Sequence, residues 1–216
     1  MTDNLLPDET FVKRWKTLEL DFSKREYDGV GTPGQIKVIQ PTSLPEILLT
    51  SVHGVNHSRN GAPKFADRGT GGLVLALCEI TGCAGVVVIG KDPGDANFDL
   101  AHNVKQIIES LTPTPRVILD FHGMKDRGVD LEIGTAKSAN FPERFVNNLI
   151  VNSTFNVVVD EVFDASREGT LTRWAQSRGI QACQLEVSSK IRLPDGKTEK
   201  MSQLIDLLAN TIRLIG

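Results

Sequence analysis

The chain contains few cysteines, and they form no recognisable pattern. Cys78, Cys83 and Cys183 are the whole set in 216 residues, and no two of them make a Cys-x-x-Cys pair. Each lies in an apolar stretch, and Cys183 alternates in phase with Leu185 on the apolar side of its predicted strand. The pattern disfavours a disulfide framework and a catalytic thiol, so we expect reduced cysteines in the core.

Tyrosine and tryptophan are scarce, and there is no excess of basic charge. The sequence has one tyrosine and two tryptophans, and 24 basic against 27 acidic residues give a formal net charge of -3. Without a basic tract or much stacking surface, we expect no nucleic-acid partner. No apolar run approaches the roughly 20 residues of a membrane span, and residues 1–20 do not resemble a signal sequence. We therefore expect no membrane partner and a cytoplasmic location.

Common nucleotide and nucleophile motifs are absent as well. The loop at residues 90–97 contains glycine and follows a predicted strand, but it lacks the Gly-x-x-x-x-Gly-Lys-[Ser/Thr] arrangement. No Gly-x-Gly-x-x-Gly follows a strand, and no Gly-x-Ser-x-Gly elbow occurs. Nucleotide binding and serine-hydrolase chemistry are therefore disfavoured.

The remaining pattern predicts one α/β domain over residues 1–216. Residues 1–35 are irregular, with a short helix expected over 10–20, and we expect them to form an N-terminal arm or flap. Further along, strands are predicted over 36–40, 46–52, 85–90, 116–121, 130–134, 156–162 and 180–187. Helices are predicted over 71–80, 99–111, 142–151, 170–177 and 202–214. This alternation indicates a layered domain with a mixed or largely parallel sheet.

Polar groups stand at the ends of several predicted strands. They are His53 with Gly54, then Asp120, His122 and Gly123, and finally Gln184, Glu186 and Ser188. Side chains alternate along a strand, so Asp120 and His122 share one face. In an open α/β sheet the ligand crevice lies beyond the carboxyl ends of the strands. We therefore expect His53, His122 and Glu186 to meet in one site.

Histidines and carboxylates together suggest a metal site. A catalytic zinc takes three protein ligands and keeps one position for water. His53 and His122 supply two ligands, and Asp67, just before a predicted helix, is the candidate third, with Asp95 as the alternative. In the competing interpretation each histidine is a satisfied polar group at a strand end, and Asp67 caps the helix.

In order and approximate spacing, these residues resemble the N-formylglutamate amidohydrolase family, a branch of the zinc carboxypeptidase-like hydrolases. The resemblance covers residues 44–192 and rests on His53-Gly54, Asp67, Asp95-Ala-Asn97, Asp120-Phe-His122-Gly123 and Gln184-Leu-Glu186. It implies a three-layer α/β sandwich of the phosphorylase/hydrolase-like kind, with a mixed, mostly parallel central sheet. It also implies Zn²⁺ held by His53, Asp67 and His122, Glu186 as the general base, and removal of formyl or acyl groups from acidic amino acids.

The sequence departs from the family pattern at two positions. Val52 precedes the first histidine, where the family usually has proline, and Phe98 stands where the family has an arginine after its Asp-x-Asn motif. A residue at another position must then bind the substrate carboxylate. Arg173 is the first candidate, because a planar guanidinium can hold a carboxylate, although it could equally be a solvated helix residue. Arg59 and Arg68 are further candidates.

The implied reaction is zinc-dependent hydrolysis of an amide C–N bond in an N-formyl or N-acyl amino acid or a short peptide. Zinc activates a water and polarises the carbonyl, Glu186 transfers the proton, and Asp120 orients a neighbouring group. One alternative is a carboxypeptidase-like or γ-glutamyl peptidase of the same fold, which an open groove would indicate. Another is an inactive binding protein. His57 and His102 are expected to be surface or helix residues.

Overall fold

The computed structural model describes residues 7–193 and 198–216. The helices are α1 (Pro7–Ser23), α2 (Thr70–Thr81), α3 (Asn103–Ser110), α4 (Glu143–Asn152), α5 (Leu171–Gln176), α6 (Ser189–Arg192) and α7 (Thr198–Arg213). The strands are β1 (Ile36–Ile39), β2 (Leu44–Ser51), β3 (His57–Arg59), β4 (Ala62–Lys64), β5 (Cys83–Val88), β6 (Val117–Met124), β7 (Leu131–Gly134), β8 (Val157–Val159) and β9 (Gln181–Ser188). Across these ranges no helix is long and apolar enough to cross a lipid bilayer.

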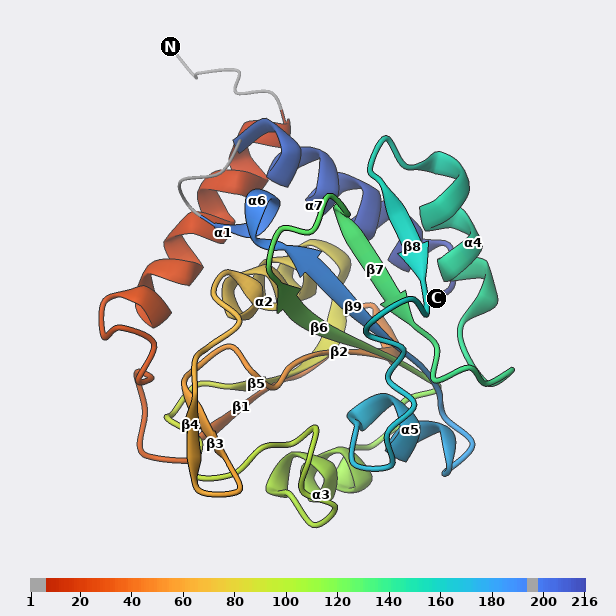
Figure 1. The fold of residues 1–216 in the computed structure, drawn as a ribbon. Coiled ribbons are helices and arrows are strands. Elements are labelled where there is room, and N and C mark those ends of the chain that lie inside the picture. The colour runs from red at the N-terminus through yellow and green to blue at the C-terminus, as the bar shows by residue number, and fades with distance from the viewer. Residues whose placement is uncertain (1–6, 194–197) are drawn as a thin grey trace.

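Seven strands form one central sheet in the order β1-β5-β2-β6-β9-β7-β8. Four neighbouring pairs are parallel, and the pairs β1–β5 and β7–β9 are antiparallel. Helices α2 and α7, with α1 beside them, lie on one side of the sheet, and α3 and α5 lie on the other (Figure 1). The expected three-layer α/β architecture with a mixed, mostly parallel sheet is confirmed.

The central strands are buried because helices cover both faces of the sheet. All residues of β5 are buried, as are all but one of β6 and all but the first of β9. This is why β5 and the first half of β6 are continuous apolar runs rather than alternating ones. Cys78, Cys83 and Cys183 are free and buried, which confirms their expected place in the core.

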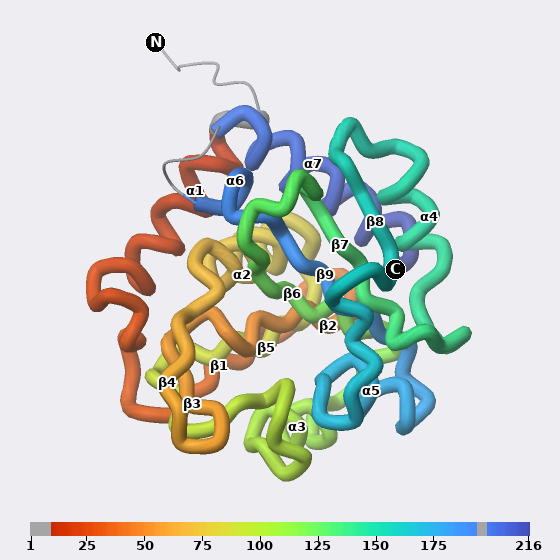
Figure 2. Tube along the Cα trace, in the orientation of Figure 1, coloured from red at the N-terminus to blue at the C-terminus, as the bar shows by residue number. Residues whose placement is uncertain are grey.

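Helix α1 (residues 7–23) is part of the core and not an arm over the body, and residues 1–6 of the expected arm lie outside the described residues. Trp15 and Phe22 of α1 are almost fully buried, and α1 packs along α2 (Figures 1 and 2). The Glu19 carboxylate accepts hydrogen bonds from the backbone N–H groups of Gly69 at 2.7 Å and Gly72 at 2.8 Å. The Trp15 indole donates to the Gly69 carbonyl at 3.0 Å. Helix α1 thereby fixes the loop that precedes α2.

A small hairpin, β3–β4, was not predicted from the sequence. Its turn is Asn60-Gly61, and both residues have positive φ, 52° and 76°. Asn-Gly between two short strands is a strong signal for a two-residue hairpin, so the sequence did contain the information. The hairpin brings His57, at the start of β3, back toward the carboxyl end of the sheet.

Candidate metal centre

The predicted site residues meet beyond the carboxyl ends of β2, β6 and β9. In the sheet register Thr50 of β2 lies beside Asp120 of β6, and His122 of β6 lies beside Glu186 of β9. His53 follows the end of β2 by two residues. Because these strands are parallel neighbours, polar residues at equivalent ends share one edge of the sheet.

Asp67 reaches the same place from the loop before α2. Its backbone N–H donates to the His53 carbonyl at 2.8 Å, and the Thr70 hydroxyl donates to the Asp67 carbonyl at 2.7 Å. Helix α2 begins after Gly69, and no side chain caps it. The Asp67 carboxylate is therefore not used as a helix cap and is free to face the histidines.

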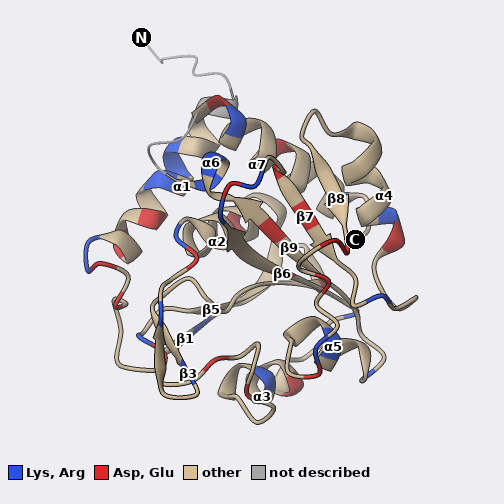
Figure 3. Ribbon diagram, viewed as in Figure 1, with Lys and Arg blue, Asp and Glu red and all other residues tan. Residues whose placement is uncertain are grey.

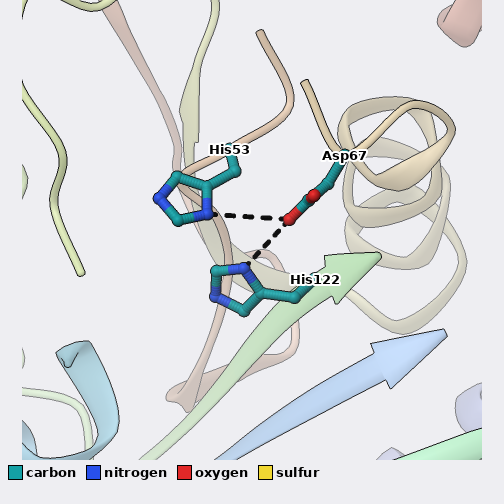
Figure 4. Close-up of side chains that lie close together, drawn as sticks. All are labelled: His53, Asp67 and His122. Atoms are coloured by element: carbon teal, nitrogen blue, oxygen red, sulfur yellow. Dashed lines mark hydrogen bonds and ion pairs between the residues drawn. The ribbon is translucent and has the colours of Figure 1, made fainter. Parts of the chain in front are cut away.

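Three side chains converge on one small volume. The Oδ2 atom of Asp67 lies 3.6 Å from Nδ1 of His53 and 3.1 Å from Nδ1 of His122 (Figure 4). The two imidazole rings are 4.8 Å apart between centroids and nearly fully buried, with 6% and 3% of each residue exposed. The structure thus brings together the three residues that the resemblance implied as ligands, and the group could hold a metal ion.

The Nε2 atom of each imidazole, on the side of the ring away from Asp67, contacts a further carboxylate. Nε2 of His53 lies 2.8 Å from Oδ1 of Asp95, and Nε2 of His122 lies 2.8 Å from Oδ2 of Asp120. Asp95 and Asp120 are completely buried. A carboxylate that accepts the far N–H of a histidine is the usual partner of a metal-binding imidazole, because it fixes the ring orientation and tautomer. Asp95, the alternative ligand, occupies this outer position here.

The donor set fits a cation. When each ring donates its Nε2–H to a carboxylate, both Nδ1 lone pairs face Asp67, and none of the three atoms has a hydrogen to share. Burial alone would lower the pKa of His122, but Asp120 and Asp67 raise that pKa well above its ordinary value. Burial would raise the pKa of Asp67, but His122 and His53 hold it below its usual range. The cluster therefore attracts positive charge, and its two nitrogens and one oxygen match the ligands of zinc.

Glu186 stands next to this cluster in a separate role. It is buried on β9, and the Gln184 side-chain amide donates to its Oε1 at 2.7 Å. Burial raises the pKa of Glu186 to about 7. A carboxyl group with a pKa near neutrality can both accept and return a proton, as general acid–base catalysis requires.

A pocket of about 430 Å³ opens from these residues. Its lining includes His53, Asp67, His122, Gln184, Glu186, Arg59 and the loop of residues 162–167. The guanidinium carbons of Arg59 and Arg167 lie 5.8 and 4.6 Å from the centre of the Phe98 ring. Nε of Arg59 also pairs with Asp95 at 2.5 Å. Phe98 therefore packs against two arginines from other parts of the chain.

The structure does not bring Arg173 to this pocket. Helix α5 turns its apolar side to the sheet, so Arg173 is exposed and lines a separate hollow with Trp174 and Arg178. Arg59 does line the pocket, whereas Arg68 lines another hollow on the far side of Asp67. Arg167 was missed, because it lies in an irregular loop with no motif or periodicity to mark it.

The expectation that His57 is a surface or helix residue is wrong. The His57 ring is buried and stacks on His53, with ring centroids 4.1 Å apart and planes 1° from parallel. Its Nε2 is 3.6 Å from Asp95 Oδ2, and burial followed by the charge of His53 lowers the pKa of His57 to about 4. His102 is mostly buried at the N-cap of α3, with Nε2 3.0 Å from Asp92.

No protein-family model and no curated protein sequence matches the chain, but solved structures share its fold. A bacteriophage poly-gamma-glutamate hydrolase is 14% identical with a TM-score of 0.55, covering 89% of this chain and 92% of that one. An N-formylglutamate amidohydrolase from Ralstonia eutropha JMP134 is 13% identical with a TM-score of 0.54, covering 84% and 97%. A metallo-carboxypeptidase from Burkholderia cenocepacia is 13% identical with a TM-score of 0.52, covering 83% and 60%. The protein thus shares its fold with these three solved structures.

Proposed function

We propose that the protein is a zinc-dependent hydrolase that cleaves an amide C–N bond in an N-acyl amino acid or a short peptide. One observation carries the proposal: two buried imidazoles, each held by a carboxylate at Nε2, turn Nδ1 toward Asp67 beside the buried Glu186. The named neighbours support it, since each is described as an amidohydrolase, a hydrolase of an amide-linked polymer or a carboxypeptidase.

Each residue of the site has a separate role in this reaction. His53, Asp67 and His122 hold the ion, which when bound polarises the scissile carbonyl and lowers the pKa of a water molecule. Glu186 accepts the proton of the attacking water and returns it to the leaving nitrogen. Gln184 holds Glu186 through its side-chain amide. No serine or cysteine nucleophile is needed.

One cation of the pocket, Arg167, favours a substrate that carries a carboxylate. The guanidinium of Arg59 pairs with Asp95, whereas no ion pair of Arg167 is found among the described residues. Arg167 lies over the Phe98 ring and donates to the Asn97 carbonyl at 2.5 Å. Arg167 therefore keeps an uncompensated positive charge at the pocket. A guanidinium binds carboxylates through two parallel N–H donors, so we assign recognition of a substrate carboxylate to Arg167.

The substitution Glu186→Gln tests this function. Purified protein is analysed for metal and assayed against formylated and acylated amino acids and short peptides. The variant is expected to keep its metal and to lose turnover by about 10²–10⁴-fold, the usual contribution of a general base. Glu168→Gln, on the exposed surface, is the matched control and should turn over like the wild type.

Two results would contradict the proposal. One is a metal-loaded wild type that binds these compounds without cleaving any of them, as an inactive binding protein would. The other is full turnover by Glu186→Gln.

A further inference from the structure

A second hollow adjoins the pocket at the candidate metal centre. It has a volume of about 1090 Å³, and Asp67 and Gly123 line both spaces. Its walls come from the residues after α1, the β3–β4 hairpin, the loop after β6 and the start of α6. The centre is therefore not the closed end of one pocket but lies between two open spaces.

Three cations of this second hollow have no acidic partner within the described ranges. They are Lys64 of the hairpin, Arg68 beside Asp67, and Lys125 after β6, and all three are exposed. Lys and Arg occur in both loops that flank the carboxyl end of β6, the one before α2 and the one after β6 (Figure 3). The chain as a whole carries a net charge of -3, so this concentration of positive charge is local.

The other charged groups of the hollow are largely engaged. Lys91 pairs with Asp28 at 3.0 Å. The buried Arg192 donates to the backbone carbonyls of Val187 and Arg68. Glu26 is exposed at the edge. After the Lys91–Asp28 pair is formed, the acidic residues that remain in the hollow are Glu26 and Asp67, so the three free cations exceed them.

Size argues against a small substrate filling both spaces. Ligand pockets for small molecules usually measure about 300–1,000 Å³, so the first pocket of about 430 Å³ could hold an acylated amino acid by itself. Such a small substrate would leave the second hollow empty. An extended ligand that crosses the metal centre would instead occupy the first pocket and the second hollow together.

We propose that the second hollow binds the carboxylates of an extended acidic peptide, whose remaining part lies in the first pocket near Arg167. The inference rests on the proposed function, because an amide bond must lie at the centre for the peptide to span both spaces. Lys64, Arg68 and Lys125 bind the carboxylates. Phe65, which is 89% exposed beside Lys64, offers an apolar face to the methylene groups of the peptide.

Equilibrium binding to the Glu186→Gln protein, loaded with Zn²⁺, tests the inference without turnover. The probes are N-acetyl-tetraglutamate and the neutral N-acetyl-tetraglutamine. Replacing Lys64, Arg68 and Lys125 together by Gln should weaken tetraglutamate binding about tenfold and leave tetraglutamine within twofold. The double variant Lys64→Gln/Lys125→Gln, which leaves the neighbour of Asp67 intact, should show a smaller loss of the same kind.

A matched triple variant controls for net charge. Lys37, Arg116 and Arg144 lie outside both spaces, and replacing them by Gln should change tetraglutamate binding by less than twofold. Equal loss in the two triple variants would overturn the inference. So would unchanged tetraglutamate binding, or tighter binding of a single-stranded oligonucleotide of the same charge.

The two proposals can fail separately. If the wild type cleaves acylated amino acids but the triple variant binds tetraglutamate unchanged, the hydrolase stands and the peptide site is overturned. If no amide is cleaved and the triple variant still loses tetraglutamate binding selectively, the hydrolase fails and the anionic binding site stands.

Discussion

The residues of the candidate centre show why its histidines differ from ordinary buried ones. An isolated buried histidine needs only hydrogen-bond partners, and neutral imidazole can satisfy both of its nitrogens. Here Asp95 and Asp120 take one nitrogen of each ring, and Asp67 faces the other. Arg59 offsets the charge of Asp95, and the negative charge of the buried Asp120 and the partly buried Asp67 is left for a proton or a metal ion to offset.

The outer carboxylate of His122 provides a test at this scale. Asp120→Asn is expected to weaken zinc binding by about 10–100-fold, because an amide cannot supply the negative charge that orients the ring and raises its basicity. Thr50, which donates to the other Asp120 oxygen at 2.5 Å, remains in place. Competition with a chromogenic chelator measures the dissociation constant. Asp126→Asn, at an exposed position, is the control, and equal constants for the two variants would argue against the orienting role.

A buried lysine gives the protein a predictable pH dependence. Lys105 is 2% exposed, and its Nζ donates to the carbonyls of Asp99 and Gly169, each at 2.8 Å. Burial lowers its pKa to about 8, against about 10.4 in the unfolded chain. Between these values the unfolded chain binds more protons than the folded one, so this group makes the folded state more stable as pH rises.

Urea unfolding at pH 7.5 and 9.5 measures this effect, with Lys105→Met as the reference that lacks the group. The variant is expected to be less stable at both pH values, because two carbonyls lose their donor. Relative to the variant, the wild type should gain on the order of 1 kcal/mol between the two pH values. Parallel pH profiles would show that Lys105 titrates normally.

Part of the site could be predicted at residue level, and part could not. The faces of β6 and β9 follow from strand alternation, which is why Asp120, His122 and Glu186 could be assigned to one place. Arg167 lies on an irregular loop, and its position depends on the Phe98 ring that it packs against. No local periodicity encodes such a contact. The burial of His57 likewise depends on how the hairpin folds over the centre.

Among the secondary-structure elements, the contact between α1 and α2 is the least predictable from sequence. Helix formation near residues 10–20 was expected, but its docking depends on the absence of side chains on α2. A Cβ atom on Gly71 would lie 2.6 Å from the Phe22 ring, and one on Gly72 would lie 2.8 Å from the backbone of Glu19. Small residues thus let the two helices approach closely. A glycine within a helix does not change the apolar periodicity of the sequence, so the close approach could not be predicted from that pattern.

The close approach of these helices can be measured. Gly71→Ala is expected to lower the free energy of unfolding by about 1–3 kcal/mol, since overpacking against the buried Phe22 outweighs the better helix propensity of alanine. Phe22→Leu should also destabilise the protein, but the double variant should lose less than the sum of the two. Urea unfolding of all four proteins gives the coupling energy. Simple additivity would show that the methyl group is accommodated without contact with Phe22.

For the molecule as a whole, the architecture was predictable because the buried strands contain apolar runs, interrupted by polar residues mainly toward the carboxyl ends of β6 and β9. Such runs occur where helices cover both faces of a sheet, and their alternation with helices limits the topology. The order of the strands could not be read in the same way. It depends on which edges pair, and β7 inserts between β9 and β8 with mixed direction.

Metal binding should stabilise the entire fold, because the ligands come from segments that are distant in the chain. Zinc at a thousandfold excess over its dissociation constant would add about 4 kcal/mol to the free energy of unfolding. For a chain of this length, that corresponds to a rise in Tm on the order of 10 °C. Thermal unfolding with a chelator and with added zinc measures the shift. Asp67→Asn should abolish most of it, and an equal shift in that variant would place the ion elsewhere.

The hydrogen bonds between α1 and the loop before α2 have a practical consequence for the design of shortened forms of this protein. Asp67 is separated from α1 by more than forty positions in sequence, yet Trp15 and Glu19 hold Gly69, two residues beyond it. Trimming the chain past Ser23 would remove these hydrogen bonds together with the buried side chains of Trp15 and Phe22. Such a fragment would be unsuitable for assays of zinc content or catalysis. A tag added ahead of Pro7 would leave the hydrogen bonds of Trp15 and Glu19 to Gly69 intact.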